Sequence, residues 1–234
     1  MIPIQDQNPT SIKPYVNWTL IIANIIIFLY SILFVIFDQF ICTYGLKPSQ
    51  ITGLVPALRG PCEQIGAFQN AGYLTFLTSM FLHGGILHIG GNMLYLWIFG
   101  DNIEDLTGHA GYIIFYMASG VAASLAHIAS DPSSLAPAIG ASGAISGVLG
   151  AYALRFPHAR VRAILFIGRF GQLIRLPAYL LIGFWFFYQL LLSLIDTTGG
   201  VAYFAHIGGF IAGLLFALAI PKKKQAQPGQ TTFS

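Results

Sequence analysis

Long apolar runs, separated by short polar segments, dominate the 234 residues of this chain. A helix needs roughly 17–25 mostly apolar residues to cross a bilayer, and several runs reach that length. Two runs are shorter, and the uncharged stretch around His83 extends one of them at its start. The pattern predicts six membrane helices, at residues 18–37, 86–99, 112–129, 141–157, 176–195 and 201–220.

The composition supports a membrane protein and excludes an ordinary soluble domain. Hydrophobic residues make up 56% of the chain and charged residues 8%, with a mean hydropathy of +0.72. A soluble domain has about a quarter charged residues. We therefore expect an all-α membrane domain at residues 15–221, flanked by tails at 1–14 and 222–234, with residues 1–10 and 225–234 disordered.

The distribution of Lys and Arg predicts the orientation, because loops that stay in the cytoplasm are enriched in these residues. With six spans, both termini lie on the same side. That side holds nine of the 11 basic residues, namely Lys13, Arg155, Arg160, Arg162, Arg169, Arg175, Lys222, Lys223 and Lys224, and the other side holds Lys47 and Arg59. Both termini are thus expected in the cytoplasm. The alternative that the first run is a cleaved signal peptide is disfavoured by its length and by the lack of a small-x-small cleavage site after it.

The net charge of +3 agrees with this topology and with attraction to anionic lipid headgroups. No basic patch with interleaved aromatic residues suggests a nucleic-acid partner. Both cysteines, Cys42 and Cys62, fall in the long loop after the first run, on the predicted outer side. A disulfide between them would contribute about 3 kcal/mol on the chain-entropy account. Two unpaired thiols are the alternative.

Three polar clusters interrupt the apolar runs, at residues 83–92, 140–147 and 205–209. Polar side chains at membrane depth are costly unless they find partners, so each cluster needs a reason. The three runs that contain them point in the same direction, and each cluster lies in the first half of its run. Asn92, Ser142 and His206 are therefore predicted to meet in one layer near the outer face.

The residue types in this layer suit nucleophilic catalysis. An imidazole can remove the proton of a serine hydroxyl at neutral pH, which makes Ser142 the candidate nucleophile and His206 its base. His88, Asn92 and the N–H of Ser142 at a helix start could stabilise an oxyanion. The GxxxG at 209–213 and the glycines in the 141–157 run predict close packing of these two helices. Each residue alone also has a structural interpretation: a small packing serine, a hydrogen-bonded histidine, or an asparagine that bridges two helices.

Together, these motifs resemble the rhomboid family of intramembrane serine proteases, over residues 81–213. The resemblance rests on the H-x4-H-x3-N of His83, His88 and Asn92, on the GxSG at 140–143, and on the AHxGG at 205–209 with its GxxxG. It implies a six-helix bundle and a Ser142–His206 dyad without a third acid. It also implies oxyanion stabilisation by His88 and Asn92, and a substrate helix that enters near the fifth span and unwinds before it is cut.

The chain departs from the family pattern at two places. Tyr73 and Leu74 stand where many members have Trp-Arg, which puts the anchoring of the first outer loop in doubt. Ser146 occupies a position that is often aromatic and stacks on the catalytic histidine. We expect Ser146 to hydrogen-bond His206 or to hold it less rigidly, and Ser146 is also the rival nucleophile because glycine follows it.

Other features are interpreted as structural. Glu104 is expected to cap or pair at the inner interface. The rings of the fifth run are expected to face lipid or to act as gate residues, and three histidines near run ends are expected at the interface. These residues are Trp185, Phe186, Phe187 and Tyr188 for the rings, and His109, His127 and His158 for the histidines.

Competing functions fit the sequence less well. A zinc protease needs His-Glu-x-x-His, and an aspartyl protease needs two Asp within its spans, and this chain has neither. A transporter would be expected to show an inverted repeat, which is not visible. An inactive rhomboid-like protein that binds membrane helices is the remaining alternative. The sequence favours an active serine endopeptidase of the cell membrane that uses no cofactor or metal, with membrane proteins as substrates.

Overall fold

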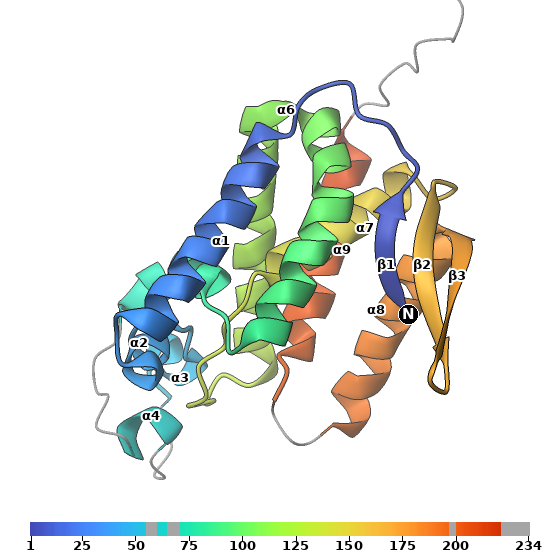
Figure 1. Ribbon diagram of the computed structural model, residues 1–234. Helices are drawn as coiled ribbons and strands as arrows, with labels where there is room; N and C mark the ends of the chain where they lie inside the picture. Colours follow the sequence, from blue (N-terminus) through green and yellow to red (C-terminus); the bar gives the residue numbers. More distant parts are fainter. Residues whose placement is uncertain (55–59, 65–70, 197–199, 221–234) are drawn as a thin grey trace, which may run out of the picture.

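The computed structural model describes residues 1–54, 60–64, 71–196 and 200–220, and its ribbon is drawn in Figure 1. The chain is mostly helical. Its helices are α1 (Tyr15–Leu33), α2 (Phe37–Tyr44), α3 (Pro48–Thr52), α4 (Pro61–Gln64), α5 (Thr75–Thr78), α6 (Ile86–Ser130), α7 (Ser142–Arg155), α8 (Ala178–Ile195) and α9 (Tyr203–Ala219), with short 3-10 turns at Gly72–Leu74 and Ser79–Phe81. Its strands are β1 (Ile2–Asp6), β2 (Arg160–Ile167) and β3 (Phe170–Pro177). The tail at 222–234 and Arg59 lie outside the described residues.

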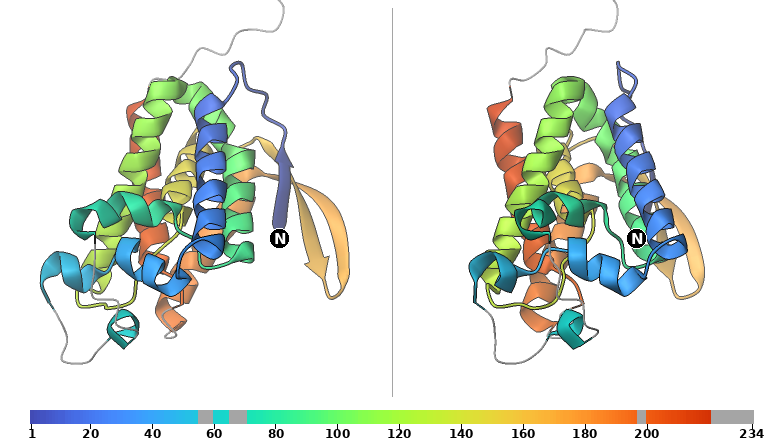
Figure 2. Two further views of the ribbon diagram at one scale, coloured as in Figure 1. Left: turned by 60° about the vertical axis from the view of Figure 1, so that its left-hand side comes forward. Right: turned by 90° about the vertical axis from the view of Figure 1, so that its left-hand side faces the viewer.

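Helix α6 consists of two arms that meet at Gly108. Gly108 has φ 73° and ψ 166°, a backbone conformation that residues with a Cβ rarely adopt. The break folds the chain back, so the two arms lie side by side in Figures 1 and 2. The runs predicted at 86–99 and 112–129 are these two arms.

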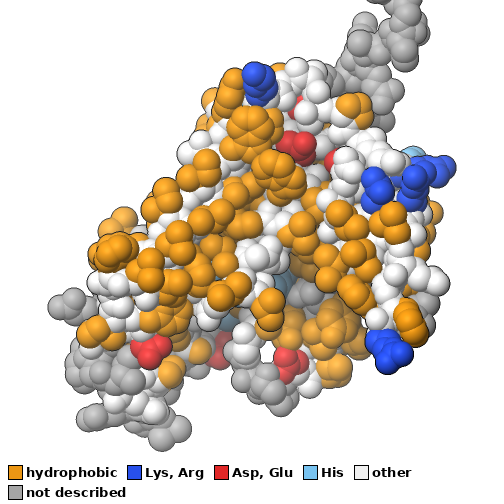
Figure 3. Space-filling view, in the orientation of Figure 1, with side chains coloured by type: hydrophobic (Ala, Val, Ile, Leu, Met, Phe, Trp, Pro, Cys, Tyr) orange, Lys and Arg blue, Asp and Glu red, His pale blue; other side chains and the backbone are white. Residues whose placement is uncertain are grey.

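The outer surfaces of the helices are apolar. Helices α1, α6 and α8 are long and apolar enough to cross a membrane, and α9 is a shorter apolar helix of 17 residues. Only 22% to 33% of the residues in the three spanning stretches are buried inside the protein. Figure 3 shows hydrophobic side chains over much of the visible face, with the few charged side chains in its upper and lower parts. An apolar surface of this extent is expected to face lipid.

Helix α7 lies at the centre of the bundle, and its residues from Gly143 to Tyr152 are all buried. Glycines allow α9 to approach it closely. A Cβ added at Gly209 or Gly213 would run into the carbonyl oxygens of Gly143 and Gly147. The predicted close packing between these two helices is therefore confirmed, and it fixes the position of the first turn of α7 against α9.

A three-stranded sheet in the order β1-β2-β3 stands beside the helices, as Figure 2 shows. Strands β2 and β3 form an antiparallel hairpin in which Ile167 pairs with Phe170 across Gly168 and Arg169. The prediction of an all-α chain is wrong here. Alternating residues such as Val161 and Ala163 are buried, and this period of two, followed by a glycine, was the missed signal for a hairpin.

The prediction that residues 1–10 are disordered is also wrong. Strand β1 pairs with the edge of β2, with Ile2 opposite Ile164 and Asp6 opposite Val161. The Asp6 carboxylate accepts hydrogen bonds from the Tyr152 hydroxyl at 2.7 Å and from Asn102 Nδ2 at 3.1 Å. The N-terminal segment is polar in sequence, yet it is ordered because α6 and α7 supply partners for its polar groups.

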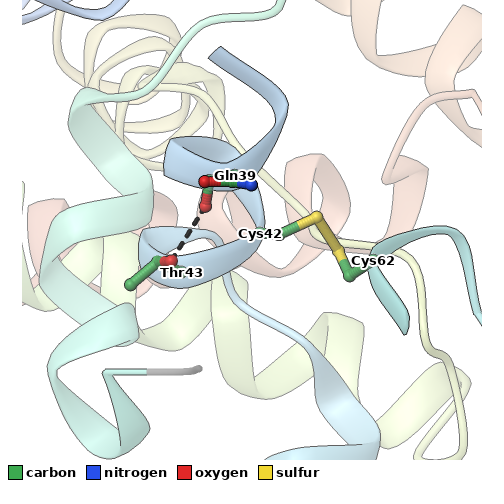
Figure 4. Close-up of a disulfide and its surroundings, with 4 residues drawn as sticks. All are labelled: Gln39, Cys42, Thr43 and Cys62. Carbon is green, nitrogen blue, oxygen red and sulfur yellow. Dashed lines mark hydrogen bonds between the residues drawn. A yellow bond between two sulfur atoms is a disulfide. The ribbon is translucent and has the colours of Figure 1, made fainter. Parts of the chain in front are cut away.

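The loop that follows α1 carries the two cysteines. In the structure a disulfide joins Cys42 of α2 to Cys62 of α4, and Figure 4 shows this bond beside Gln39 and Thr43. Both cysteines are buried, with exposed fractions of 5% and 0%. The disulfide thus joins α2 to α4, and residues 55–59 between these two helices lie outside the described residues.

Candidate active site

Ser142 is the first residue of α7, at the end of a loop whose shape depends on Gly140. Gly140 has φ 124°, and its N–H donates to the Ser79 carbonyl at 2.9 Å. A Cβ added at Gly140 would lie 2.7 Å from His88 Nε2 and 3.6 Å from Ser142 Oγ. Only glycine fits here, because any side chain would be strained and would displace His88 from its place beside Ser142.

His206 lies on the first turn of α9 and faces Ser142. Its Nε2 is 2.7 Å from Ser142 Oγ, which is hydrogen-bond distance. Its Nδ1 is 2.8 Å from Oε1 of Gln189 on α8. The Trp185 ring lies one turn before Gln189, with its centroid 6.0 Å from that of the imidazole. Three helices thus hold the serine and histidine in one arrangement.

His88 and Asn92 lie one turn apart at the start of α6. The Gly84 N–H donates to His88 Nδ1 at 3.2 Å, so the ring hydrogen is on Nε2, the atom that faces Gly140. Asn92 is 7% exposed, and its Nδ2 has no hydrogen-bond partner among the described residues. His88 therefore has an N–H group that faces Gly140, two residues before α7, and Asn92 has a buried N–H group without a partner in the described part of the chain.

A cavity of about 740 Å³ opens over Ser142, His206 and His88. Its lining includes Leu87 and His88 from α6, Ser142 from α7 and His206 from α9. Ile139 and Val201, in the loops before α7 and α9, also line it. Its volume is in the range of sites that bind small molecules or short peptide segments. A smaller cavity of about 40 Å³ also reaches Ser142, and His127 is one of its lining residues.

The remaining candidates do not take part in the contact between Ser142 and His206. The Ser146 hydroxyl is 0% exposed and donates to the Ser142 carbonyl at 2.6 Å. In the described part of the chain, no hydrogen bond joins Ser146 to His206. Tyr73 and Leu74 are exposed, at 77% and 62%.

The aromatic residues of α8 divide into two groups. The Trp185 and Phe186 rings face α9, since Phe186 stacks on Phe210 with centroids 4.1 Å apart. The Phe187 and Tyr188 rings point outward and are 61% and 48% exposed. Sequence reasoning missed Gln189, and its signal was a single amide within an apolar run.

Two of the peripheral histidines make specific contacts. His109 Nδ1 lies 2.5 Å from the Glu104 carboxylate, and the His158 ring packs edge-on against Tyr179. No group of three His, Cys, Asp or Glu side chains within the described ranges could hold a metal ion.

The fold and the site define a class: a helical membrane protein with a hydrogen-bonded serine and histidine beneath a cavity. Residues 70–223 match the rhomboid domain. The chain therefore belongs to the rhomboid family.

Three relatives illustrate the similarity. The chain is 32% identical over 158 residues to the mitochondrial rhomboid protein 1 of Saccharomyces cerevisiae, which covers 66% of this chain and 44% of that protein. It is 34% identical over 158 residues to the rhomboid protease GluP of Bacillus subtilis, covering 68% of this chain and 28% of that protein. The human mitochondrial presenilin-associated rhomboid-like protein is 32% identical over 96 residues, covering 40% of this chain and 25% of that protein. The chain thus matches less than half the length of each.

Proposed function

We propose that this chain is an intramembrane serine endopeptidase that cleaves transmembrane segments of membrane proteins. The observation that carries the proposal is the 2.7 Å contact between Ser142 Oγ and His206 Nε2 beneath a cavity of about 740 Å³. A serine hydroxyl becomes a useful nucleophile when a base accepts its proton. The name of the relative GluP, which includes the word protease, agrees with this activity.

In this mechanism, His206 Nε2 takes the hydroxyl proton as Ser142 Oγ attacks the carbonyl carbon of the scissile peptide bond. The negative charge then develops on the former carbonyl oxygen. His88 Nε2–H, Asn92 Nδ2–H and the Ser142 N–H are the donors proposed to stabilise it. When the C–N bond breaks, His206 returns the proton to the leaving amine. A water molecule then hydrolyses the acyl-enzyme by the same proton transfer to His206.

The proposed topology has six spans, formed by α1, the two arms of α6, α7, α8 and α9, with both termini in the cytoplasm. The membrane domain is residues 15–221, flanked by segments 1–14 and 222–234. The excess of Lys and Arg on the side of the termini supports this orientation in the cell membrane. The cavity then opens toward the outer face, and single-span or multi-span membrane proteins are the proposed substrates.

The alternative is a rhomboid-like protein that binds membrane helices without cutting them. Of the three relatives described above, two are named rhomboid protein or rhomboid-like protein, without the word protease. The site supports the active enzyme more strongly, because the serine, the histidine and the additional N–H donor His88 line one cavity.

The test is cleavage of a single-span membrane substrate by the purified protein in detergent. Wild type is compared with Ser142→Ala, His206→Ala and Ser146→Ala. We expect the first two variants to lose about 10⁴-fold or more in kcat, because either change removes the nucleophile or its base. Ser146→Ala is the matched control, a serine one turn away on the same helix, and we expect it to retain activity within about threefold.

Two results would contradict the proposal in different ways. Undiminished cleavage by Ser142→Ala together with loss in Ser146→Ala would make Ser146 the nucleophile. No cleavage by wild type of several single-span substrates, with retained binding of those substrates, would favour the helix-binding alternative.

A further inference from the structure

The imidazole of His206 makes a hydrogen bond through each of its ring nitrogens. Nε2 meets Ser142 Oγ at 2.7 Å, and Nδ1 meets Gln189 Oε1 at 2.8 Å. Gln189 is 7% exposed and lies in the middle of α8, where its neighbours along the chain are apolar. Burying an amide costs free energy unless it is hydrogen-bonded, so this contact accounts for the polar residue at this place.

The two contacts together determine where the ring hydrogen is. The Gln189 carbonyl oxygen can only accept, so Nδ1 must carry the hydrogen and donate it. A neutral imidazole has one N–H, which leaves a lone pair on Nε2. Nε2 can then accept the Ser142 hydroxyl proton. The other tautomer would place a hydrogen between Nε2 and Ser142 Oγ and could not act as a base.

We propose that Gln189 is a positioning residue that holds His206 in the tautomer able to activate Ser142, an inference that rests on the proposed function. It does so without a charge, so the third member of this hydrogen-bonded chain is a neutral amide. With its Oε1 toward Nδ1, the amide selects the same tautomer that a carboxylate would, but it gives less stabilisation to the imidazolium that forms during the reaction.

The contact also links the base to one particular helix. Trp185 and Gln189 are four residues apart and therefore project from the same face of α8, toward His206. Displacement of α8 from α9 would remove the ring contact and the hydrogen-bond acceptor at the same time. The position of α8 thereby controls whether His206 is ready to accept a proton.

The charged groups around His206 are few. His88 and His127, both on α6, are the titratable groups that act on it across the site. Helix α7 supplies the Ser142 hydroxyl and α8 supplies the Gln189 amide, both uncharged. At the start of α9, Tyr203 donates to Asp196 at the end of α8. A carboxylate introduced at position 189 would therefore bring a negative charge into direct contact with the His206 ring.

The experiment compares Gln189→Met and Gln189→Glu with wild type in detergent. Methionine keeps the length of the side chain but cannot accept the hydrogen bond, whereas glutamate accepts it and adds a charge. Ser193→Ala is the matched control, because Ser193 lies one turn further along α8 and bonds to the Leu190 carbonyl of its own helix. Two rates are measured from pH 5 to 9: kcat and KM for the single-span substrate, and phosphonylation of Ser142 by a fluorophosphonate, in which fluoride leaves.

We expect Gln189→Met to lower kcat and the phosphonylation rate about 100-fold while KM stays within about twofold, because a tautomer defect acts on the base rather than on binding. We expect Gln189→Glu to retain at least about a tenth of the wild-type rate at its own optimum. The acidic limb of its pH–rate profile should move to higher pH by about one unit, because the carboxylate stabilises the protonated imidazole of His206. Ser193→Ala should match wild type.

Either of two results would overturn the proposal: wild-type rates in Gln189→Met, or equal loss in both variants with an unshifted acidic limb in Gln189→Glu. If Gln189→Met fails to fold, the pH profile of Gln189→Glu decides alone. If wild type neither cleaves substrate nor reacts with the fluorophosphonate, it is the proposed function that fails. Nitrogen-15 shifts of the His206 ring then test the contact directly, since a hydrogen on Nε2 in wild type would overturn it and a hydrogen on Nδ1 would support it.

Discussion

Two polar clusters lie buried in the same bundle, and they differ in how completely their hydrogen bonds are made. The Glu104 cluster consists of Glu104, Asn17 and Tyr112. The Glu104 carboxylate accepts from the Val16 and Asn17 N–H groups at 3.0 and 2.7 Å, and Tyr112 donates to Asn17 Oδ1 at 2.8 Å. The predicted capping role of Glu104 is confirmed, since it binds the N–H groups of the first turn of α1.

The Ser142 cluster consists of Ser142, His206, His88 and Asn92. Asn92 Nδ2 has no partner among the described residues. A cavity reaches Ser142, His206 and His88, whereas Glu104 is 0% exposed. Buried polar groups normally have partners, so the unpaired Asn92 Nδ2 needs an explanation that the Glu104 cluster does not. The two clusters contain similar residue types, and they differ in whether every donor has a partner among the described residues.

Within this comparison, the largest effect is expected in the Ser142 cluster. Replacing Asn92 by alanine removes a proposed oxyanion donor, and we expect kcat to fall by about 10²–10³-fold. The free energy of unfolding should change by less than about 1 kcal/mol, because the lost Nδ2 group has no partner among the described residues. Cleavage kinetics and denaturant unfolding in detergent, on the same preparations, measure the two quantities.

Asn102→Ala is the matched control for Asn92→Ala, since Asn102 is also a buried asparagine on α6. It has partners, however, because its Nδ2 donates to Asp6 at 3.1 Å and to Asp101 at 2.8 Å. We expect the control to lose stability and to keep its kcat. The opposite pattern, with stability lost in Asn92→Ala and kcat unchanged, would erase the distinction between the clusters.

A smaller effect is expected in the Glu104 cluster. Glu104→Gln keeps the size of the side chain but replaces one carboxylate oxygen with an NH₂ group that cannot accept from Val16 or Asn17. We expect a loss of about 2 kcal/mol in the free energy of unfolding, as for a buried charge-assisted hydrogen bond, with kcat of the folded enzyme unchanged. A loss of activity without loss of stability would assign Glu104 a role in the reaction.

Much of the fold and of the candidate site could be predicted from local features of the sequence. The length of the apolar runs predicts the helices. The polar clusters at 83–92, 140–147 and 205–209 are recognisable because they interrupt these runs. Because successive membrane runs alternate in direction, Ser142 and His206 are predicted to lie in one layer. The spacing of the glycines predicts that α7 and α9 pack closely. These signals are local, or depend only on counting runs.

Gln189 and the sheet depend on information that is not local. Whether Gln189 faces His206 or lipid depends on the rotation of α8 about its axis, which its packing against α9 decides. Strand β1 forms because β2 offers an unpaired edge more than 150 residues along the chain. The pairing of a short polar segment with so distant an edge leaves little trace in its own sequence.

The smallest expected effect concerns Asp6, a polar group whose hydrogen bonds are made but whose charge is poorly accommodated. Burial, together with the nearby Asp101, raises the pKa of Asp6 from 3.8 to about 6, although the Tyr152 hydrogen bond opposes this shift. Because the pKa is higher when β1 is docked, the proton binds more tightly in the docked state. The stabilisation is fully present below about pH 4 and is lost as the pH rises through about 6.

We therefore expect the docking of β1 to weaken by about 1 kcal/mol between pH 4 and pH 6, a modest figure because solvent screens a partly exposed carboxyl. Asp6→Asn mimics the protonated carboxyl, so its docking should not change over this range. Hydrogen exchange at residues 2–7, corrected for the intrinsic rate at each pH, measures the difference. Asp38→Asn, at an exposed position on α2, is the matched control and should keep the wild-type dependence. A dependence that persists in Asp6→Asn would assign the titration to Asp101 instead.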